Sequence, residues 1–263
     1  MKKYVASTGI VSLALMTGCA SSDAEGGSDE GASAEDCQIQ EHAMGTRWFQ
    51  QGAEARALQE QTFRFASDRL DQIVEEEGGS EGLAIITDLD ETAIDNSALL
   101  ARDMAECHDF TAWDTWGHWE QEGTPRVIPG ALDFYDHADE LGITIFYLSD
   151  RFEENYDDTF ATLEELDFPQ VEDDQVLLLG DPKQDRREGV EADYDVVMQL
   201  GDTLHDFDGA FADADLEEQQ EMVEEQRERF GDDWIVLPNP AYGEWEDADL
   251  DEWDAELEVD EDA

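Results

Sequence analysis

The sequence has very few positively charged residues. It contains 14 Lys and Arg against 71 Asp and Glu among its 263 residues, which gives a formal net charge of -57. A chain without a basic surface cannot neutralise a phosphate backbone, so a role in wrapping nucleic acid is excluded. The surplus carboxylates repel one another, and salt screens that repulsion because the Debye length falls to about 3 Å at molar ionic strength. We therefore expect a solvated acidic surface adapted to high salt.

A hydrophobic run long enough to cross a membrane is lacking at the N-terminus. Lys2 and Lys3 precede a short apolar stretch at residues 5–16, and Met16-Thr17-Gly18-Cys19 follows it. Positive residues, a short apolar run and small residues before a cysteine are typical of a bacterial lipoprotein signal. We predict that residues 1–19 are a signal peptide of this kind and that Cys19 carries a lipid anchor. An ordinary secretory signal with a chance cysteine is the alternative.

Cysteine is scarce, with 3 residues in the chain. After Cys19, only Cys37 and Cys107 remain, and an exported protein permits a disulfide between them. The sequence does not show whether the two lie close together, so their pairing stays open. Behind the signal, residues 20–36 are rich in Gly, Ser, Asp and Glu without apolar periodicity, and we predict a flexible acidic tether over residues 20–42.

Apolar residues nevertheless make up 40% of the chain, enough for a real core. They recur at helical spacing from residue 44 to about 77, which predicts one or two amphipathic helices ended by Gly78-Gly79. Further helical patterns at residues 131–141 and 156–166 alternate with short apolar runs. The runs are Leu83–Ile86, Ile143–Leu148, Val176–Leu179, Val196–Leu200 and Trp234–Leu237. This alternation predicts an α/β fold with a Rossmann-like open parallel sheet and right-handed crossovers.

Two segments depart from the alternation. Residues 98–129 hold three Trp and two His without a strand period, which predicts a small, mainly helical cap inserted between the first two strands. Residues 247–263 are mainly acidic and predict a loose tail. The folded domain should therefore cover residues 43–246, with the helical segment at its N-terminal side. In open parallel sheets, ligands bind beyond the carboxyl ends of the strands.

The first strand runs into two aspartates, Asp88 and Asp90. Residues two apart in an extended segment face the same way, so both carboxylates can point into one crevice. Two such groups can bind a divalent cation and divide nucleophilic from acid–base work. A calcium-binding loop fails on spacing, because Ala93 and Leu99 stand where that loop needs Gly and Glu. Surface acid without function is the remaining alternative in so acidic a chain.

Later strand ends also carry polar residues that suit phosphate chemistry. Ser149 ends the second strand, and Lys183 follows the third as the single lysine beyond the signal. A compact ammonium suits the neutralisation of a phosphoryl group between carboxylates. Asp202 and Asp206 follow the fourth strand. Hard oxygen ligands from separate strands predict Mg²⁺ as the cofactor.

These motifs, in this order, resemble the haloacid dehalogenase superfamily of phosphohydrolases. The resemblance is closer to its class C bacterial acid phosphatases, which are outer-membrane lipoproteins that act on 5′-nucleotides and other phosphomonoesters. It covers about residues 44–246, including the opening helix. The segments that carry it are Asp88–Ser97, Trp113–Trp116, Phe146–Arg151, Gly201–Phe207 and Leu237–Glu246. The implied core is that of the haloacid dehalogenase superfamily.

The resemblance implies a role for each strand-end residue. Asp88 would attack phosphorus and form an aspartyl-phosphate, and Asp90 would protonate the leaving oxygen and then activate water. Ser149 and Lys183 would hold the transferring group. Phosphoryl transfer needs chiefly in-line positioning and charge neutralisation, which agrees with these roles. The implied Mg²⁺ ligands are Asp88, the backbone carbonyl of Asp90, and Asp202, with Asp206 in support.

The aromatic residues bear on substrate choice. We assign substrate contacts to Trp113, Trp116 and Tyr242, since in the family aromatic rings flank the pocket, and rings stack nucleobases for about 1–3 kcal/mol. Packing inside the cap is the alternative for each Trp. Arg151, after the second strand, is also assigned to the substrate.

Three features depart from the family pattern. Asp150 and Thr203 stand where the family has Asn, and the loop before Lys183 is a few residues shorter. None of these differences removes a catalytic group, so they concern affinity and rate more than the class of reaction.

Two classes of function remain from the sequence. The first is a phosphomonoesterase, whose partners would be a small phosphomonoester and, through the lipid, the periplasmic or cell-surface face of the bacterial outer membrane. A phosphotransferase is a variant of it, because an aspartyl-phosphate can also pass to an alcohol. The second is a non-catalytic lipoprotein that keeps the fold to bind a ligand or cation, which the complete catalytic set disfavours.

Overall fold

The structure, a computed structural model, describes residues 37–246 and 248–254. The α-helices are α1 (Ala43–Gln51), α2 (Ala53–Glu77), α3 (Ser97–Glu106), α4 (Trp116–Glu122), α5 (Ala131–Glu140), α6 (Tyr156–Glu165), α7 (Lys183–Glu191) and α8 (Leu216–Glu225). Short 3₁₀ helices are η2 (Gln38–His42), η3 (Phe110–Ala112), η4 (Glu153–Asn155), η5 (Leu204–Asp206) and η6 (Gly209–Phe211). None of the helices in this part of the chain is both long and apolar enough to cross a bilayer.

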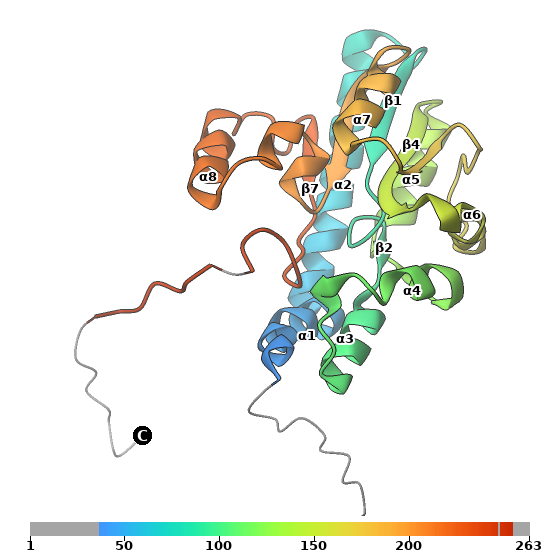
Figure 1. The fold of residues 1–263 in the computed structure, drawn as a ribbon. Helices are drawn as coiled ribbons and strands as arrows, with labels where there is room; N and C mark the ends of the chain where they lie inside the picture. Colours follow the sequence, from blue (N-terminus) through green and yellow to red (C-terminus); the bar gives the residue numbers. More distant parts are fainter. Residues whose placement is uncertain (1–36, 247, 255–263) are drawn as a thin grey trace, which may run out of the picture. The chain divides into compact units, whose positions relative to one another are not determined.

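A five-stranded parallel sheet forms the centre of the domain (Figure 1). Its strands lie in the order β5-β4-β1-β6-β7, and each pairs in parallel with its neighbours. They are β1 (Leu83–Thr87), β4 (Thr144–Phe152), β5 (Val176–Leu179), β6 (Asp195–Gly201) and β7 (Trp234–Val236). Each of the five apolar runs of the sequence contributes one of these strands, so the predicted α/β fold with an open parallel sheet is confirmed.

Both faces of the central strand are buried, which explains its unbroken apolar run. Leu83 and Ile85 of β1 belong to the larger core cluster, while Ala84 and Ile86 belong to a second cluster with Val190 of α7. Successive residues of a strand point to opposite faces, so each set of alternate residues enters one cluster.

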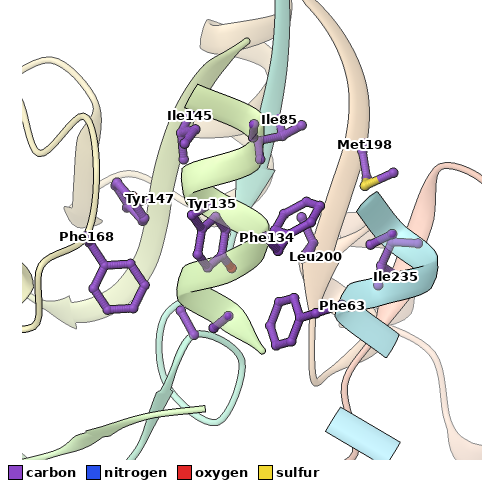
Figure 2. Packing of buried hydrophobic residues seen from close by; sticks show 14 of the residues in the cluster. Phe63, Ile85, Phe134, Tyr135, Ile145, Tyr147, Phe168, Met198, Leu200 and Ile235 are labelled. Atoms are coloured by element: carbon purple, nitrogen blue, oxygen red, sulfur yellow. The ribbon is translucent and has the colours of Figure 1, made fainter. Parts of the chain in front are cut away.

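The larger cluster is built around aromatic rings from two helices. Phe63 of α2 lies 5.7 Å from Phe134 and 6.0 Å from Tyr135 of α5, measured between ring centroids. Figure 2 shows these rings beside Ile85 and Ile145 of the sheet. Full burial of such a side chain contributes about 1.5–3 kcal/mol, so this cluster is a main source of stability.

The predicted N-terminal helical segment forms two helices separated by one residue. Gly52 has extended backbone angles between α1 and α2, and a Cβ at this position would lie 2.5 Å from the Trp48 carbonyl oxygen. Helix α2 ends at Gly78, whose φ of 78° is left-handed. Glycine adopts that conformation without steric cost, so Gly78 ends the helix as predicted.

The segment between β1 and α5 contains α3, η3 and α4, and a small antiparallel pair of strands, β2 (Ile94–Asp95) and β3 (Arg126–Val127). This pair was not predicted, because two residues are too few to show a strand period. A disulfide joins Cys37 to Cys107 at the end of α3, which answers the question that the sequence left open. It packs in one cluster with Trp116 and Tyr242.

Two predicted segments lie wholly or partly outside the described residues. They are the signal and tether over residues 1–36, including Cys19, and the tail at residues 247 and 255–263. Residues 248–254 carry no regular secondary structure.

Candidate active site

A cavity of about 520 Å³ lies where the carboxyl ends of β1, β4 and β6 meet. Of the residues predicted for the site, its wall contains Asp88, Asp90, Trp113, Trp116, Arg151, Lys183, Asp202, Asp206 and Tyr242. Ser149 is not among the lining residues that the described chain provides, and its side chain is fully buried. The prediction that the strand ends share one crevice therefore holds for most of the set.

Lys183 is a buried cation that contacts two of the aspartates at this site. It is the first residue of α7, after the three-residue loop that follows β5, and its Nζ donates to Asp88 Oδ1 at 2.7 Å and to Asp206 Oδ1 at 2.6 Å. Burial lowers the pKa of this ammonium, but Asp206 and Asp88 outweigh burial and raise it above its ordinary value. Lys183 therefore stays charged, and the shorter loop before it does not displace it from the site.

Three carboxylates lie close together beside this lysine. One oxygen from each of Asp88, Asp202 and Asp206 lies within 4.8 Å of the others. Burial, with Asp206 and Asp90 adding to it, raises the pKa of Asp88 to about 7 although Lys183 lowers it. Burial and Asp206 also raise the pKa of Asp202 well above its ordinary value. One ammonium does not neutralise the cluster, so a divalent cation with a preference for oxygen ligands fits it.

The fourth strand end shapes the loop that holds Asp206. The backbone N–H groups of Asp202 and Thr203 donate to Asp206 Oδ2 at 3.2 and 3.0 Å, and the Thr203 hydroxyl donates to the same oxygen at 2.9 Å. Gly201 is required beside it, since a Cβ there would lie 2.3 Å from Asp206 Cβ. Burial raises the pKa of Asp206, but the charges of Lys183 and His205 and the hydrogen bonds from Lys183 and Thr203 together outweigh burial, so the net shift is downward. Thr203, one of the departures from the family, thus supports Asp206 directly.

Asp90 is surrounded by hydrogen-bond donors. Arg151 Nε and Nη2 donate to its Oδ1 at 3.0 and 2.8 Å, and Asn96 Nδ2 donates to the same oxygen at 2.8 Å. Ser149 Oγ donates to Oδ2 at 3.3 Å. Arg151 and Ser149 were predicted to contact the substrate or its phosphoryl group, but in this structure both direct their donors to Asp90. Arg151 still reaches the cavity wall, whereas Ser149 does not.

The three predicted aromatic residues form one group on the cavity wall. Ring centroids of Trp113 lie 5.2 Å from Trp116 and 5.3 Å from Tyr242, and those of Trp116 and Tyr242 are 6.1 Å apart. Trp116 and Tyr242 are buried, while Trp113 is 45% exposed. Trp116 packs in the cluster of the cap segment, as its alternative predicted, and the exposed Trp113 lines the cavity. Contact of the three rings with a substrate stays a prediction.

Sequence reasoning assigned no role to several residues that support the site. Thr92 Oγ1 and Asn239 Nδ2 donate to the two oxygens of Asp202 at 2.9 and 2.7 Å. Buried Glu91 accepts the Tyr242 hydroxyl and the Asn96 backbone N–H, the latter at 2.8 Å, and burial raises its pKa to about 8. These residues lie within the recognised motifs. Their contacts, however, join Tyr242 to Glu91 and Thr92 to Asp202 across more than a hundred positions, which spacing alone does not show.

The other departure from the family pattern lies at the rim. Asp150 forms an ion pair with Arg186 of α7, whose Nη1 also donates to the Ser149 carbonyl at 2.7 Å. A carboxylate at this position therefore links β4 to α7, and it removes no group from the catalytic set.

An open parallel sheet whose strand ends bring several aspartates and a charged lysine into one cavity is typical of α/β enzymes that transfer phosphoryl groups. The chain belongs to the HAD superfamily, subfamily IIIB (acid phosphatase), because the model of that family matches residues 14–245. It is therefore a phosphoric monoester hydrolase of the acid phosphatase family.

Solved structures agree with the family. The structure of the class C acid phosphatase from Bacillus anthracis is similar with a TM-score of 0.74 and 32% sequence identity, over 80% of this chain and 88% of that one. A crystal structure of the class C acid phosphatase from the same organism with tungstate bound is similar with a TM-score of 0.75 and 30% identity, over 83% and 93% of the two chains.

Proposed function

We propose that this acid phosphatase hydrolyses 5′-nucleotides and related phosphomonoesters through an aspartyl-phosphate on Asp88, with Mg²⁺ as its metal. The observation that carries the proposal is the contact between Lys183 and Asp88 inside a cluster of three carboxylates. A nucleophile, a cation beside it and a further set of oxygen donors are what in-line phosphoryl transfer requires.

The side chains of this chain divide the reaction between them. Asp88 attacks phosphorus with one carboxylate oxygen, the bond to the leaving oxygen breaks, and Asp90 gives that oxygen its proton. Asp90 then takes a proton from the water that hydrolyses the aspartyl-phosphate, which releases phosphate and restores Asp88. Lys183 offsets the negative charge of the phosphoryl oxygens throughout. Ser149 keeps Asp90 in place rather than holding the phosphoryl group directly, as its hydrogen bond supports.

Asp88, Asp202 and Asp206 would hold the metal, with the Asp90 backbone carbonyl as the further ligand implied by the family. Their oxygen donors suit Mg²⁺, and phosphatases of this superfamily generally use a divalent metal. A bound Mg²⁺ would supply charge that stabilises the transferring phosphoryl group. Tungstate, a tetrahedral oxyanion, is bound in the Bacillus anthracis relative, which supports an oxyanion site in this fold.

The cavity favours a substrate with one phosphate and an uncharged ring. Trp113 is 45% exposed and lines the cavity, so its ring is available to stack a base, and such stacking contributes about 1–3 kcal/mol. The cavity cations Lys183 and Arg151 both face aspartates, and Glu120, Glu244 and other acids line the same wall. A second phosphate would meet carboxylates there, so nucleoside monophosphates fit better than triphosphates.

A lipid anchor at Cys19 and a place on the periplasmic or cell-surface face of the bacterial outer membrane complete the proposal. They rest on the sequence pattern of residues 1–19 alone.

Phosphate release by the domain from residue 37 onward, in molar salt, tests the reaction. The substrates are 5′-AMP and p-nitrophenyl phosphate, each with Mg²⁺ and with EDTA. We expect turnover that needs the metal and falls at least about a thousandfold in Asp88→Asn, because that variant loses the nucleophile. A folded protein that leaves both esters intact would rule out the phosphatase mechanism and favour a ligand-binding lipoprotein.

A further inference from the structure

We infer that Trp119 of α4, acting through the side chain of Asn96, is a positioning residue for Asp90 during leaving-group protonation. The inference rests on the proposed function, since it takes Asp90 as the general acid. It concerns two residues that contact neither the carboxylate cluster nor Lys183 in the hydrogen bonds of the described chain.

Asn96 lies between Trp119 and Asp90, and its side chain is fully buried. Its Nδ2 donates to Asp90 Oδ1 at 2.8 Å and to Glu91 Oε2 at 3.4 Å. Its Oδ1 accepts from Trp119 Nε1 at 2.8 Å and from Arg151 Nη2 at 3.3 Å. Every polar atom of this amide therefore has a partner, as a buried polar group requires.

The two ends of the Asn96 amide are chemically different, and its partners fix which end faces Asp90. If the amide turned over, its NH₂ would face the N–H donors of Trp119 and Arg151, and its oxygen would face two carboxylates. The indole of Trp119 makes the shorter of the two hydrogen bonds to Oδ1. Without that bond, the amide loses one of the two donors that direct its oxygen away from Asp90, and its orientation then depends on Arg151 and the two carboxylates.

The Trp119 ring is itself held in place. A Cβ at position 123 would lie 2.4 Å from Trp119 Cδ2, so Gly123 leaves the space that the ring fills. The next residue, Glu120, accepts from the Phe152 backbone N–H at 3.3 Å and from Asn155 Nδ2 at 2.6 Å, which attaches α4 to the end of β4. A rigid donor that points at a buried amide can fix the amide's orientation.

Helix α4 therefore carries two groups with different tasks. Trp116 lies on the cavity wall, where the leaving group would bind, and Trp119 faces the amide that positions the acid. The same helix of the cap segment thus lines the site where the leaving group would bind and helps to orient Asp90.

Trp119→Phe tests the inference, because it removes the N–H and keeps an aromatic ring. The measured quantity is kcat/KM for glycerol phosphate, whose alkoxide must be protonated as it leaves, and for p-nitrophenyl phosphate, whose phenolate leaves without a proton. General acid catalysis is worth roughly 10²–10⁴-fold, so a misdirected acid should lower kcat/KM about tenfold for the alkyl ester and less than about threefold for the aryl ester. KM for the aryl ester should stay the same.

Trp234→Phe is the matched control. Its indole nitrogen is buried without a hydrogen-bond partner among the described residues, and it lies in a separate core cluster. We expect that variant to leave the ratio between the two esters unchanged. Gly123→Ala is the second variant: it keeps the indole of Trp119 but displaces it, and it should lower the same ratio.

Equal losses on both esters in Trp119→Phe, with an unchanged unfolding midpoint, would overturn the inference, as would no loss on either. Those outcomes leave the proposed function intact as long as the unchanged protein hydrolyses both esters and Asp90→Asn loses the alkyl ester. An unchanged protein that hydrolyses neither ester would overturn the proposed function and this inference with it.

Discussion

At the scale of single residues, the site shifts the pKa values of two neighbouring carboxylates in opposite directions. Asp202 and Asp206 come from one short loop, yet the pKa of Asp202 is raised by burial and that of Asp206 is lowered, although burial opposes this, by Lys183. Within residues 37–246 and 248–254, the side chain of Asp202 accepts from two neutral donors, Thr92 and Asn239. A difference in partners, rather than in depth, therefore separates the two groups, as in other enzymes that divide acid and base work.

Glu91 gives a pH prediction at this scale. Burial raises its pKa from 4.5 to about 8, so the folded state binds a proton that the unfolded state releases above about pH 4.5. The unfolding free energy should therefore fall as the pH rises from about 4.5 to 8 and level off above that. Glu91→Gln keeps a neutral acceptor for Tyr242 and should flatten this slope and raise stability at pH 8. Urea unfolding in EDTA across this range measures it.

The same slope in Glu91→Gln and in the unchanged protein would contradict this assignment. Glu60→Gln is the control, since Glu60 lies on the exposed side of α2 in an ion pair with Arg56 and should leave the slope in place.

At the scale of elements, the sequence predicted the helices and strands that have a clear local pattern of apolar residues. Strand β1 is buried on both faces, and each of the other four sheet strands contains a short apolar run, so all five could be predicted. Gly78 likewise indicated the end of α2. Helix α8 was missed, although Asp215 and Glu218 form a capping box at its start that could have indicated it. The support for Asp90 was missed for a different reason. Asn96 and Trp119 act through contacts between different elements, and a pattern along the sequence does not show such contacts.

The disulfide gives a prediction for one element pair. Cys37–Cys107 closes a loop of 70 residues and ties η2 to the end of α3. Closing a loop of this length removes conformations from the unfolded chain, and a native disulfide typically contributes about 2–4 kcal/mol. Cys37→Ser with Cys107→Ser should lower the unfolding free energy by that amount in urea titrations. Because the bond packs with Trp116 and Tyr242, KM for 5′-AMP should rise more than kcat falls.

Comparison with the unchanged protein under reducing conditions separates loss of the bond from loss of the side chains. Reduction should reproduce the stability of the double Ser variant. Equal stability of the oxidised and reduced protein would show that the bond contributes nothing to folding.

At the scale of the whole molecule, the excess of negative charge is the main feature that bears on stability. The net charge of -57 leaves most carboxylates without a cation, and Lys183, the one lysine after Lys3, lies in the cavity between two aspartates. Self-repulsion of this size favours expanded states at low ionic strength. Each aspartate of the site has its pKa and position set by specific neighbours. The surface acids act together, through their shared negative charge.

Stability should therefore increase with salt. Between about 0.1 M and 1 M ionic strength the Debye length falls from about 10 Å to about 3 Å, which screens the repulsion between surface carboxylates that lie apart. It also weakens exposed ion pairs such as Arg56–Glu60, but each of these is worth only about 0–1 kcal/mol and they are few beside the 71 acids. The unfolding midpoint should rise with KCl and NaCl alike at equal concentration. Sucrose, which favours burial without screening, serves as the control and should raise the midpoint less. A midpoint that stays constant from low to molar salt would contradict a salt-adapted surface and leave the acid excess without a role in stability.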